Sequence, residues 1–538
     1  MRLIDSLAAR SRKFIQHRFV AVDIDPKRTI SLFSLIGLPL LFASAYFLPV
    51  LTPTGAYLLQ SNDLIRLVVL PSLVGVLVGS GSLFLVVHAA RRWLAPRLAT
   101  FGAVIAVSIM CLVGLKSIMY AAGYDWRNVI SHGHDMLASA RRVKYAMALI
   151  VIVVVWVTRG ALPKWSRLLS SLGFAVGALA IFRLLVVWFG ANPPPLQARA
   201  AGNPVTSAAQ GMTSREARRV VWVIFDESDF GLIYPVAETQ ERKLANFARL
   251  AQSSVFATNA NSPASSTLYS IPALLMGQPL GGSGIRISAS ATLSIQSKED
   301  RSIGLREETT IFGALAANGR TASVLGFYHP YCKLFKLRRC DSFAYPEAGG
   351  LDAVLWANSP DAIEAKLRRV DYWESMTREM LDLLPEYMAL NDALTFVHLN
   401  VPHPPSNYAN KVLHLSSSAD PIVEYSHNLM LADRVLGDII RNLVQQIPRQ
   451  EVLLVVSTDH WFRNRWYQAD KPEASRPVLF IAWKVGETKG YVLSQPVSTV
   501  HTADMILDYL NGKLNSQADI AGWWADQPVD PSFIAPAI

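Results

Sequence analysis

Charged side chains are scarce in this chain, because Asp, Glu, Lys and Arg make up only 17% of its 538 residues. Hydrophobic residues make up 51%, and the mean hydropathy is positive, at +0.25. A soluble chain of this length rarely has a positive mean hydropathy, which argues against an ordinary cytosolic enzyme. The length leaves room for a membrane part and one large globular domain.

Acidic residues are fewest in the first 200 positions, which hold 6 Asp and Glu against 21 Lys and Arg. Residues 201–538 hold 35 acidic and 30 basic residues, so the basic excess lies entirely in the first part. There, charge in the loops sets membrane orientation and meets lipid phosphate. The net charge of +10 is therefore not a sign of nucleic-acid binding, which we exclude.

Five apolar stretches dominate this first part, at about 30–51, 65–90, 101–123, 145–160 and 168–191. Each is close to the roughly 20 residues that cross a bilayer as a helix. No small-residue cleavage site follows the first stretch, so we interpret it as a retained anchor rather than a signal peptide. The basic leader indicates a cytoplasmic N-terminus, and five spans then place everything after residue 192 outside the cytoplasm.

Three regions are therefore expected. They are a transmembrane domain over 1–191, a linker rich in Pro, Ala, Gly and Ser over 192–219, and a globular domain over 220–538. The loop 124–144 is expected outside, yet it carries four basic residues. Two interpretations stay open: tolerated charge, or a basic interfacial helix that holds an anionic lipid headgroup.

From residue 220 onward, short apolar runs alternate with amphipathic stretches. The runs are Val220–Phe225, Ala322–Gly326, Leu394–Leu399, Val452–Ser457 and Val478–Trp483. Continuous apolar strands separated by helices are typical of a mostly parallel sheet that is covered on both faces. The sequence therefore predicts an α/β/α sandwich with a mostly parallel sheet.

Acidic and imidazole side chains follow three of these runs. The first run leads into Glu227, the third leads to His403, and the fourth is followed by Asp459 and His460. In such sheets the chemistry collects beyond the carboxyl ends of the strands. Each residue alone is more often a helix cap or a solvated loop residue. Together, mixed carboxylate and imidazole ligands indicate a site for zinc or a similar divalent ion.

A hydroxyl-rich loop precedes a short apolar helix, and Ser265, Ser266 and Thr267 stand where this helix should begin. Such residues mostly cap a helix. A hydroxyl there also lies in the positive potential of the helix N-terminus, which favours an alkoxide and the phosphoryl group that it attacks. If this hydroxyl also bound a metal, its pKa would fall and it would become a nucleophile near neutral pH. The residues alone leave both roles open.

These motifs resemble those of the membrane-anchored phosphoethanolamine transferases of Gram-negative envelopes, within the sulfatase and alkaline phosphatase superfamily. Family segments match at Asp226-Glu227-Ser228, at Asn259 with Thr267, Ser270 and Pro272, at His398 with His403 and Pro405, and at Thr458-Asp459-His460. As architecture the resemblance covers the whole chain, with five membrane helices, a linker and an α/β/α domain. The motif matches lie at roughly 220–510.

The resemblance implies a role for each matched residue. The implied zinc ligands are Glu227, Thr267, Asp459 and His460. Thr267 becomes the nucleophile, and His403 acts on the phosphate side or at a second metal. Asn259 and His398 become substrate-binding candidates.

The chain also departs from the family pattern. Pro263 and Ala273 replace the cysteines that flank the family's nucleophile, and its second distal histidine has no counterpart. Arg463, Arg465 or Lys471 could supply the positive charge that a second metal would otherwise give, or all three could be solvated surface charges. Arg463 and Arg465 are also substrate-binding candidates. A second zinc site therefore stays open.

Two of the three cysteines, Cys332 and Cys340, lie eight residues apart in the domain expected outside the cytoplasm. In an oxidising compartment they would pair, and the alternative is two free thiols. Their spacing matches that of one disulfide in the family that the chain resembles.

The implied activity is a two-step transfer through a phospho-threonine. The donor would be phosphatidylethanolamine, and the acceptor lipid A or another envelope glycan. The protein would lie in the bacterial inner membrane with its catalytic domain in the periplasm. Alternatives are a phosphoglycerol transferase, a sulfatase-like or phosphodiesterase hydrolase, and a degenerate scaffold or sensor. The loop around Thr267 lacks the Arg of the formylglycine motif, which counts against a common sulfatase.

Overall fold

The computed structural model describes part of the chain. The described residues are 37, 40–41, 57, 104, 107–108, 111–112, 149–190, 218–235, 244–287, 293–297, 302–344, 362–404, 421–446, 450–468 and 476–528. The chain forms two compact units. The first comprises Met1–Gly55 and Asp63–Phe189, and the second comprises Ala56–Asn62 and Gly190–Ile538.

The first unit contributes one long described helix, α9 (Leu162–Gly190), which overlaps the last of the predicted membrane spans. Among the residues that the structure describes, no helix combines the length and the apolar content that a membrane crossing requires. Most residues of the predicted spans at 30–51, 65–90 and 101–123 lie outside the described ones, as do the loop 124–144 and the linker 192–217. The five-helix bundle stays a prediction.

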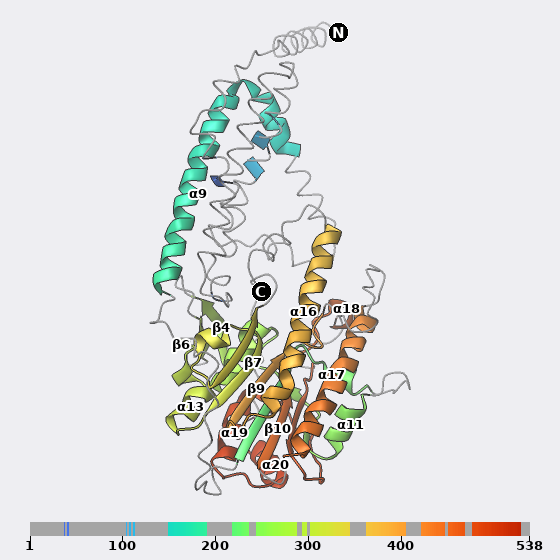
Figure 1. Cartoon of the computed structure of the whole chain (residues 1–538). Helices are drawn as coiled ribbons and strands as arrows, with labels where there is room; N and C mark the ends of the chain where they lie inside the picture. Colours follow the sequence, from blue (N-terminus) through green and yellow to red (C-terminus); the bar gives the residue numbers. More distant parts are fainter. Residues whose placement is uncertain are drawn as a thin grey trace. The chain divides into compact units, whose positions relative to one another are not determined.

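The second unit is built on an eight-stranded sheet (Figure 1). From edge to edge its strands are β12 (Tyr491–Leu493), β2 (Val255–Ala257), β11 (Phe480–Lys484), β10 (Glu451–Ser457), β1 (Arg218–Phe225), β9 (Leu394–Leu399), β7 (Ala322–Tyr328) and β8 (Arg339–Ala344). The five strands from β10 to β8 are all parallel. Only β11 runs antiparallel to both of its neighbours.

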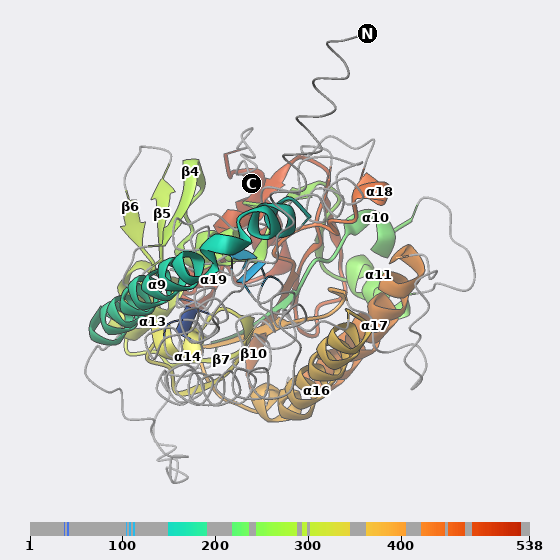
Figure 2. The same ribbon diagram turned by 90° about the horizontal axis from the view of Figure 1, so that it is seen from above.

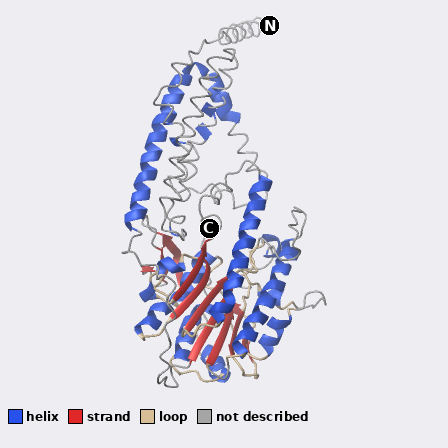
Figure 3. Cartoon of the chain, viewed as in Figure 1, coloured by secondary structure: helices blue, strands red, loops and turns tan. Residues whose placement is uncertain are grey.

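Helices cover both faces of this sheet, so the domain has three layers (Figure 3). One layer contains α12 (Thr267–Met276), α13 (Ile311–Ala317), α19 (Thr502–Leu510) and α20 (Gln517–Ala525). The other contains α11 (Ala245–Gln252), α16 (Ala362–Met388) and α17 (Pro421–Val444), and α16 and α17 lie side by side in Figure 2.

The central strand β1 shows why the sheet is covered on both faces. Val220, Trp222 and Ile224 pack into one core, while the alternate residues Val221 and Val223 pack into the other. Because successive strand side chains point to opposite faces, a continuous apolar run buries both sides at once. The predicted three-layer α/β arrangement with a mostly parallel sheet is therefore confirmed for this unit.

The remaining described elements are small. Two strands, β3 (Ala260–Asn261) and β13 (Val497–Ser498), form a parallel pair, and β4 (Leu280–Ile287), β5 (Leu293–Ser297) and β6 (Ser302–Gly304) form an antiparallel sheet. Short helices are α10 (Phe230–Ile233), α14 (Tyr331–Leu334) and α18 (Arg465–Gln468). Among them, α14 carries Cys332, which forms a disulfide with Cys340 of β8.

Candidate metal and nucleophile site

The carboxyl ends of three adjacent parallel strands bring the candidate residues together. Asp226 and Glu227 follow β1, His398 lies near the end of β9, and Asp459 and His460 follow β10. The register pairs Ile224 of β1 with His398, so the two strands reach this edge together. The edge is therefore the place at which a sheet of this kind collects polar groups.

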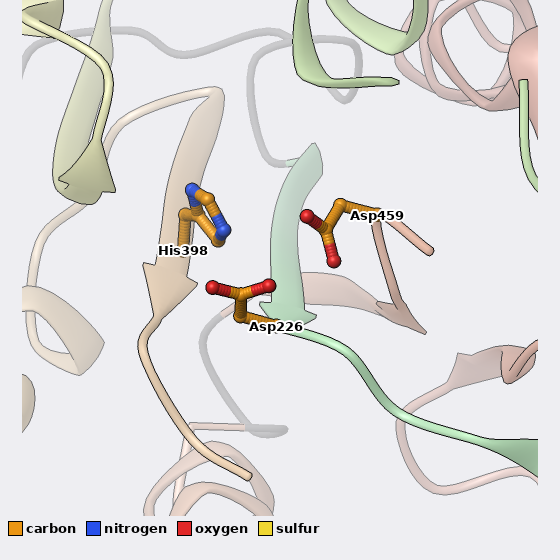
Figure 4. A group of neighbouring side chains, drawn as sticks. All are labelled: Asp226, His398 and Asp459. Carbon is orange, nitrogen blue, oxygen red and sulfur yellow. The ribbon is translucent and has the colours of Figure 1, made fainter. Parts of the chain in front are cut away.

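A buried group of three side chains lies at the centre of this edge: Asp226, His398 and Asp459 (Figure 4). One nitrogen or oxygen atom of each lies within 4.8 Å of the others, and all three residues are fully buried. Both carboxylate oxygens of Asp226, Oδ2 of Asp459 and Nε2 of His398 have no hydrogen-bond partner.

These unpartnered atoms fit a divalent cation. Buried polar atoms almost always find a partner, and leaving one without any costs about 1–3 kcal/mol. A cation held by the three side chains would satisfy all of them at once. Two carboxylates and an imidazole are ligands that suit zinc among the transition metals.

His460 adds a further nitrogen to the group. Its Nδ1 lies 2.9 Å from the carbonyl oxygen of Trp461, which can only accept, so Nδ1 carries the proton of the ring. Burial lowers the pKa of His460, so the ring is neutral and Nε2 holds a free electron pair. This Nε2 lies 3.3 Å from Oδ2 of Asp459 and 3.8 Å from Oδ1 of Asp226. A cation bound between this lone pair and the two carboxylates would stabilise the arrangement.

Thr267 places its hydroxyl against the same nitrogen. It is the first residue of α12, after the N-cap Ser266, and only 4% of its surface is exposed. Its Oγ1 lies 3.3 Å from Nε2 of His460, and since that nitrogen is unprotonated, the hydroxyl donates to it. The neighbouring Ser266 makes no capping hydrogen bond with its side chain. The structure thus brings Thr267 to the cluster, at the start of a helix where the field favours an anion.

Glu227 has an unusual backbone conformation, and its carboxylate contacts Arg463. Its φ of 64° lies in the left-handed region, which costs a non-glycine residue of order 1 kcal/mol or more. Two bonds hold it there: its N–H donates to Oδ1 of Asp459, and its carbonyl accepts from the hydroxyl of Tyr425. The carboxylate then meets the backbone N–H and the Nε of Arg463, at 2.9 and 3.1 Å.

His403 completes this second group of charges. Its Nδ1 donates to the carbonyl of Pro404, and its Nε2 lies 3.4 Å from Nη2 of Arg463 and 3.5 Å from the carboxylate of Glu227. The ring stacks on Trp373, with centroids 5.3 Å apart. The side chain of Arg463 remains 41% exposed, so its guanidinium can reach a bound anion as well as Glu227.

The pKa values at this edge follow from burial and crowding of charge. Burial, together with the nearby Asp459 and Glu227, raises the pKa of Asp226 well above its usual range. Burial opposes the ionisation of Glu227 as well, but His403 and Arg463 outweigh it and lower the pKa of Glu227. Asp226 is therefore the carboxyl group that stays protonated when no cation offsets its charge.

His398 is held in place by Tyr331, whose hydroxyl lies 2.9 Å from its Nδ1. The Tyr331 ring lies directly over Gly326 of β7, where an added Cβ would come within 2.3 Å of a ring carbon. Glycine is thus required here by close approach of the ring. A metal-binding imidazole whose other nitrogen is fixed by a hydrogen bond is the usual arrangement in metal sites.

The sequence-based assignments differ in part from this geometry. Asp459 belongs to the buried cluster, together with Asp226, for which the sequence motifs imply no role, and His398, which the resemblance makes a substrate-binding candidate. Metal binding by Glu227, Thr267 and His460 stays a prediction. The sequence does contain two signals for the cluster: an acid directly after a buried strand, and a single histidine within a buried strand. Both are costly to bury without a partner, so both indicate a bound group.

Two further predicted substrate residues lie elsewhere in the described structure. The carbonyl of Asn259 accepts from the N–H of Val497, between β2 and β3. Arg465 is the first residue of α18, and its side chain lies outside the described residues. Their contacts with substrate stay predictions.

Comparison with known proteins gave one family match. The sulfatase family model matches residues 218–512, which include every strand of the large sheet. Among curated proteins, none matched the sequence.

Several solved structures are similar to part of this chain. Lipoteichoic acid synthase LtaP from Listeria monocytogenes has 13% sequence identity and a TM-score of 0.38, over 57% of this chain and 76% of that one. The C-terminal periplasmic domain of phosphoethanolamine transferase EptC from Campylobacter jejuni has 16% identity and a TM-score of 0.33, over 55% and 89%. Phosphonate monoester hydrolase of Agrobacterium radiobacter has 13% identity and a TM-score of 0.35, over 54% and 73%.

Proposed function

Because the chain belongs to the sulfatase family, whose members are enzymes, we propose that it is a metal-dependent phosphoryl-group transferase with Thr267 as nucleophile. Its main support is the position of the Thr267 hydroxyl, 3.3 Å from Nε2 of His460 and beside unpartnered ligand atoms. A buried nucleophile, an acceptor for its proton and a group of free carboxylate and imidazole atoms are the parts that such a reaction needs.

The metal would be held by Asp226, His398 and Asp459, and zinc suits these ligands. When bound, it supplies positive charge that lowers the pKa of the neighbouring hydroxyl and offsets the charge of a phosphoryl group. The chain's own residues do the rest: α12 orients the hydroxyl, and burial excludes water from it.

The first step joins the Thr267 oxygen to the phosphorus of a phosphodiester. The hydroxyl proton passes to Nε2 of His460, the acceptor it already faces. The new Oγ1–P bond forms as the P–O bond to the lipid alcohol breaks, and that alcohol leaves with the proton. In the second step an acceptor hydroxyl attacks the same phosphorus, the Oγ1–P bond breaks, and the acceptor's proton passes by way of Nε2 of His460 to the Thr267 oxygen. A phospho-threonine that carries the headgroup links the two steps.

Arg463 has the position of a charge clamp in this scheme. Its guanidinium is fixed by Glu227 on one side and is partly exposed on the other. A fixed cation beside the cluster stabilises the oxygens of a phosphoryl group as they gain charge. We propose that it takes the part that a second metal would otherwise have.

The proposed donor is phosphatidylethanolamine and the proposed acceptor lipid A or another envelope glycan, both from the sequence resemblance. The leaving alcohol would then be diacylglycerol. The apolar N-terminal part of the chain supports a bilayer-confined donor, since a tethered enzyme meets such a substrate at raised effective concentration. In this proposal the protein lies in the bacterial inner membrane, with its N-terminus in the cytoplasm and its catalytic domain in the periplasm.

The test is the mass of the peptide that contains Thr267, after the purified full-length protein meets phosphatidylethanolamine vesicles and zinc. Wild type should carry a phosphoethanolamine increment on this peptide, and Thr267→Ser should retain part of it. The increment should vanish in Thr267→Ala and persist in the matched control Ser266→Ala, which changes the adjacent hydroxyl. Wild-type turnover in Thr267→Ala would refute the assignment.

Two further outcomes would change the substrate rather than the nucleophile. A phosphoglycerol increment with phosphatidylglycerol vesicles would identify a phosphoglycerol transferase. Release of free phosphoethanolamine without modification of any acceptor would identify a hydrolase.

A further inference from the structure

A chain of two hydrogen bonds begins at Tyr57 and ends at the backbone carbonyl of Thr267, the proposed nucleophile. Although Tyr57 lies more than 200 positions before Thr267 in the sequence, the segment Ala56–Asn62 belongs to the same compact unit as the large sheet. Its side chain is 1% exposed and packs in the core that also contains α12. Its hydroxyl lies 2.9 Å from Nδ1 of His329.

The direction of each bond follows from elementary chemistry. Nε2 of His329 lies 3.0 Å from the carbonyl oxygen of Thr267, which can only accept, so Nε2 carries a proton. The ring is fully buried, and burial disfavours its charged form, so the ring is neutral. Nδ1 therefore accepts, and the Tyr57 hydroxyl donates to it.

The protein holds His329 firmly at its own backbone. It follows Tyr328, whose φ of 76° lies in the left-handed region, directly after β7. Its carbonyl accepts from the N–H of Tyr331 and from the hydroxyl of Ser342. The Tyr57 ring meets the imidazole edge-on, with centroids 5.8 Å apart. The backbone of His329 is therefore fixed, and the bond from Tyr57 favours the same tautomer as the Thr267 carbonyl, with the proton on Nε2.

We propose that Tyr57 is a positioning residue for the nucleophile: its hydroxyl fixes the His329 tautomer that donates to the Thr267 carbonyl, and so holds the first turn of α12 against His460. The inference rests on the proposed function of Thr267. It adds that a residue from the N-terminal part of the chain, between the first two predicted membrane spans, sets the geometry of the reaction.

Two readouts test the proposal in the full-length protein with zinc. The first is the rate of phosphoethanolamine incorporation at Thr267. Tyr57→Phe keeps the ring and removes only the donor, which leaves the buried Nδ1 without a partner. We expect about a tenfold fall in the maximal rate, with the KM for vesicle phosphatidylethanolamine and the zinc content both unchanged.

His329→Ala should lose as much, and the double variant should lose no more than either single variant, because the two residues act as one unit. Tyr387→Phe is the matched control, since it removes another buried tyrosine hydroxyl, which donates to Asp341 away from the site. A wild-type rate in Tyr57→Phe, or losses that multiply in the double variant, would overturn the proposal.

The second readout needs no turnover. Amide hydrogen exchange in the peptide that covers residues 266–276 should become about tenfold faster in Tyr57→Phe and should not change in Tyr387→Phe. Unchanged exchange at α12 would overturn the proposal even if the wild type transferred nothing. Altered exchange in a protein without any adduct at Thr267 would instead contradict the proposed function and leave the positioning role in place.

Discussion

Removing the metal should make the stability of the catalytic unit fall as the pH rises, because Asp226 is buried beside a second carboxylate. Its folded-state pKa is raised by burial and by Asp459 and Glu227. In the unfolded chain the same group titrates near its ordinary value of about 3.9. Above that pH the unfolded chain releases a proton that the folded protein retains, and the free energy of unfolding declines.

The size of this effect follows from linkage. One proton retained only by the folded state lowers the free energy of unfolding by up to about 1.4 kcal/mol per pH unit. The stability is complete below the unfolded-state pKa and is lost as the pH rises toward and through the raised folded-state pKa of Asp226. Asp226→Asn removes this proton, so the difference in slope between wild type and variant reports the titration of the Asp226–Asp459 pair.

The assay is urea unfolding followed by tryptophan fluorescence, from pH 4 to pH 7, with a chelator and then with saturating zinc. Zinc should stabilise wild type at neutral pH, since it binds the folded state and offsets both carboxylates. Asp226→Asn should lose most of this gain. Asp392→Asn is the control: Asp392 is a buried carboxylate that accepts from Ser323 and Arg338 outside the site, and its loss should lower stability without changing the zinc response. Equal slopes for chelated wild type and Asp226→Asn would refute the reasoning.

Three other changes test neighbouring parts of the structure. Gly326→Ala should push the ring of Tyr331 away and lower the free energy of unfolding by about 1–3 kcal/mol. It should also weaken zinc binding about 10-fold or more, as measured by titration calorimetry, and unaltered zinc binding would contradict the role of Tyr331. Arg463→Met should slow transfer about 100-fold, because Glu227 loses its partner and the phosphoryl group loses a fixed cation, and steady-state rates that match wild type would exclude the clamp. Cys332→Ser removes the disulfide between two cysteines that lie eight residues apart. The loss of this cross-link should lower the free energy of unfolding by about 2.5 kcal/mol on the chain-entropy account, which a fall in the urea midpoint would show.

The sequence was sufficient for the large sheet, because a strand that is buried on both faces must be apolar throughout. The run Leu394–Leu399 is β9 as predicted, and Val220–Phe225 and Val452–Ser457 lie within β1 and β10. The expected alkaline phosphatase- and sulfatase-like α/β domain is confirmed by the family match. The run at Val478–Trp483 begins two residues later, as β11, and is antiparallel. Apolar content carries no sign of strand direction, so only the fold could decide that.

The site shows the same division between local pattern and tertiary contact. The sequence by itself determined which strand ends carry acids and imidazoles, and which hydroxyl begins α12. Only the tertiary structure decided that Asp226 enters the cluster while Glu227 turns to Arg463, because the backbone of Glu227 is held at positive φ by Asp459 and the hydroxyl of Tyr425. It also brought Tyr57 to the nucleophile, since a contact across 272 positions to His329 leaves no trace in the local pattern of either segment.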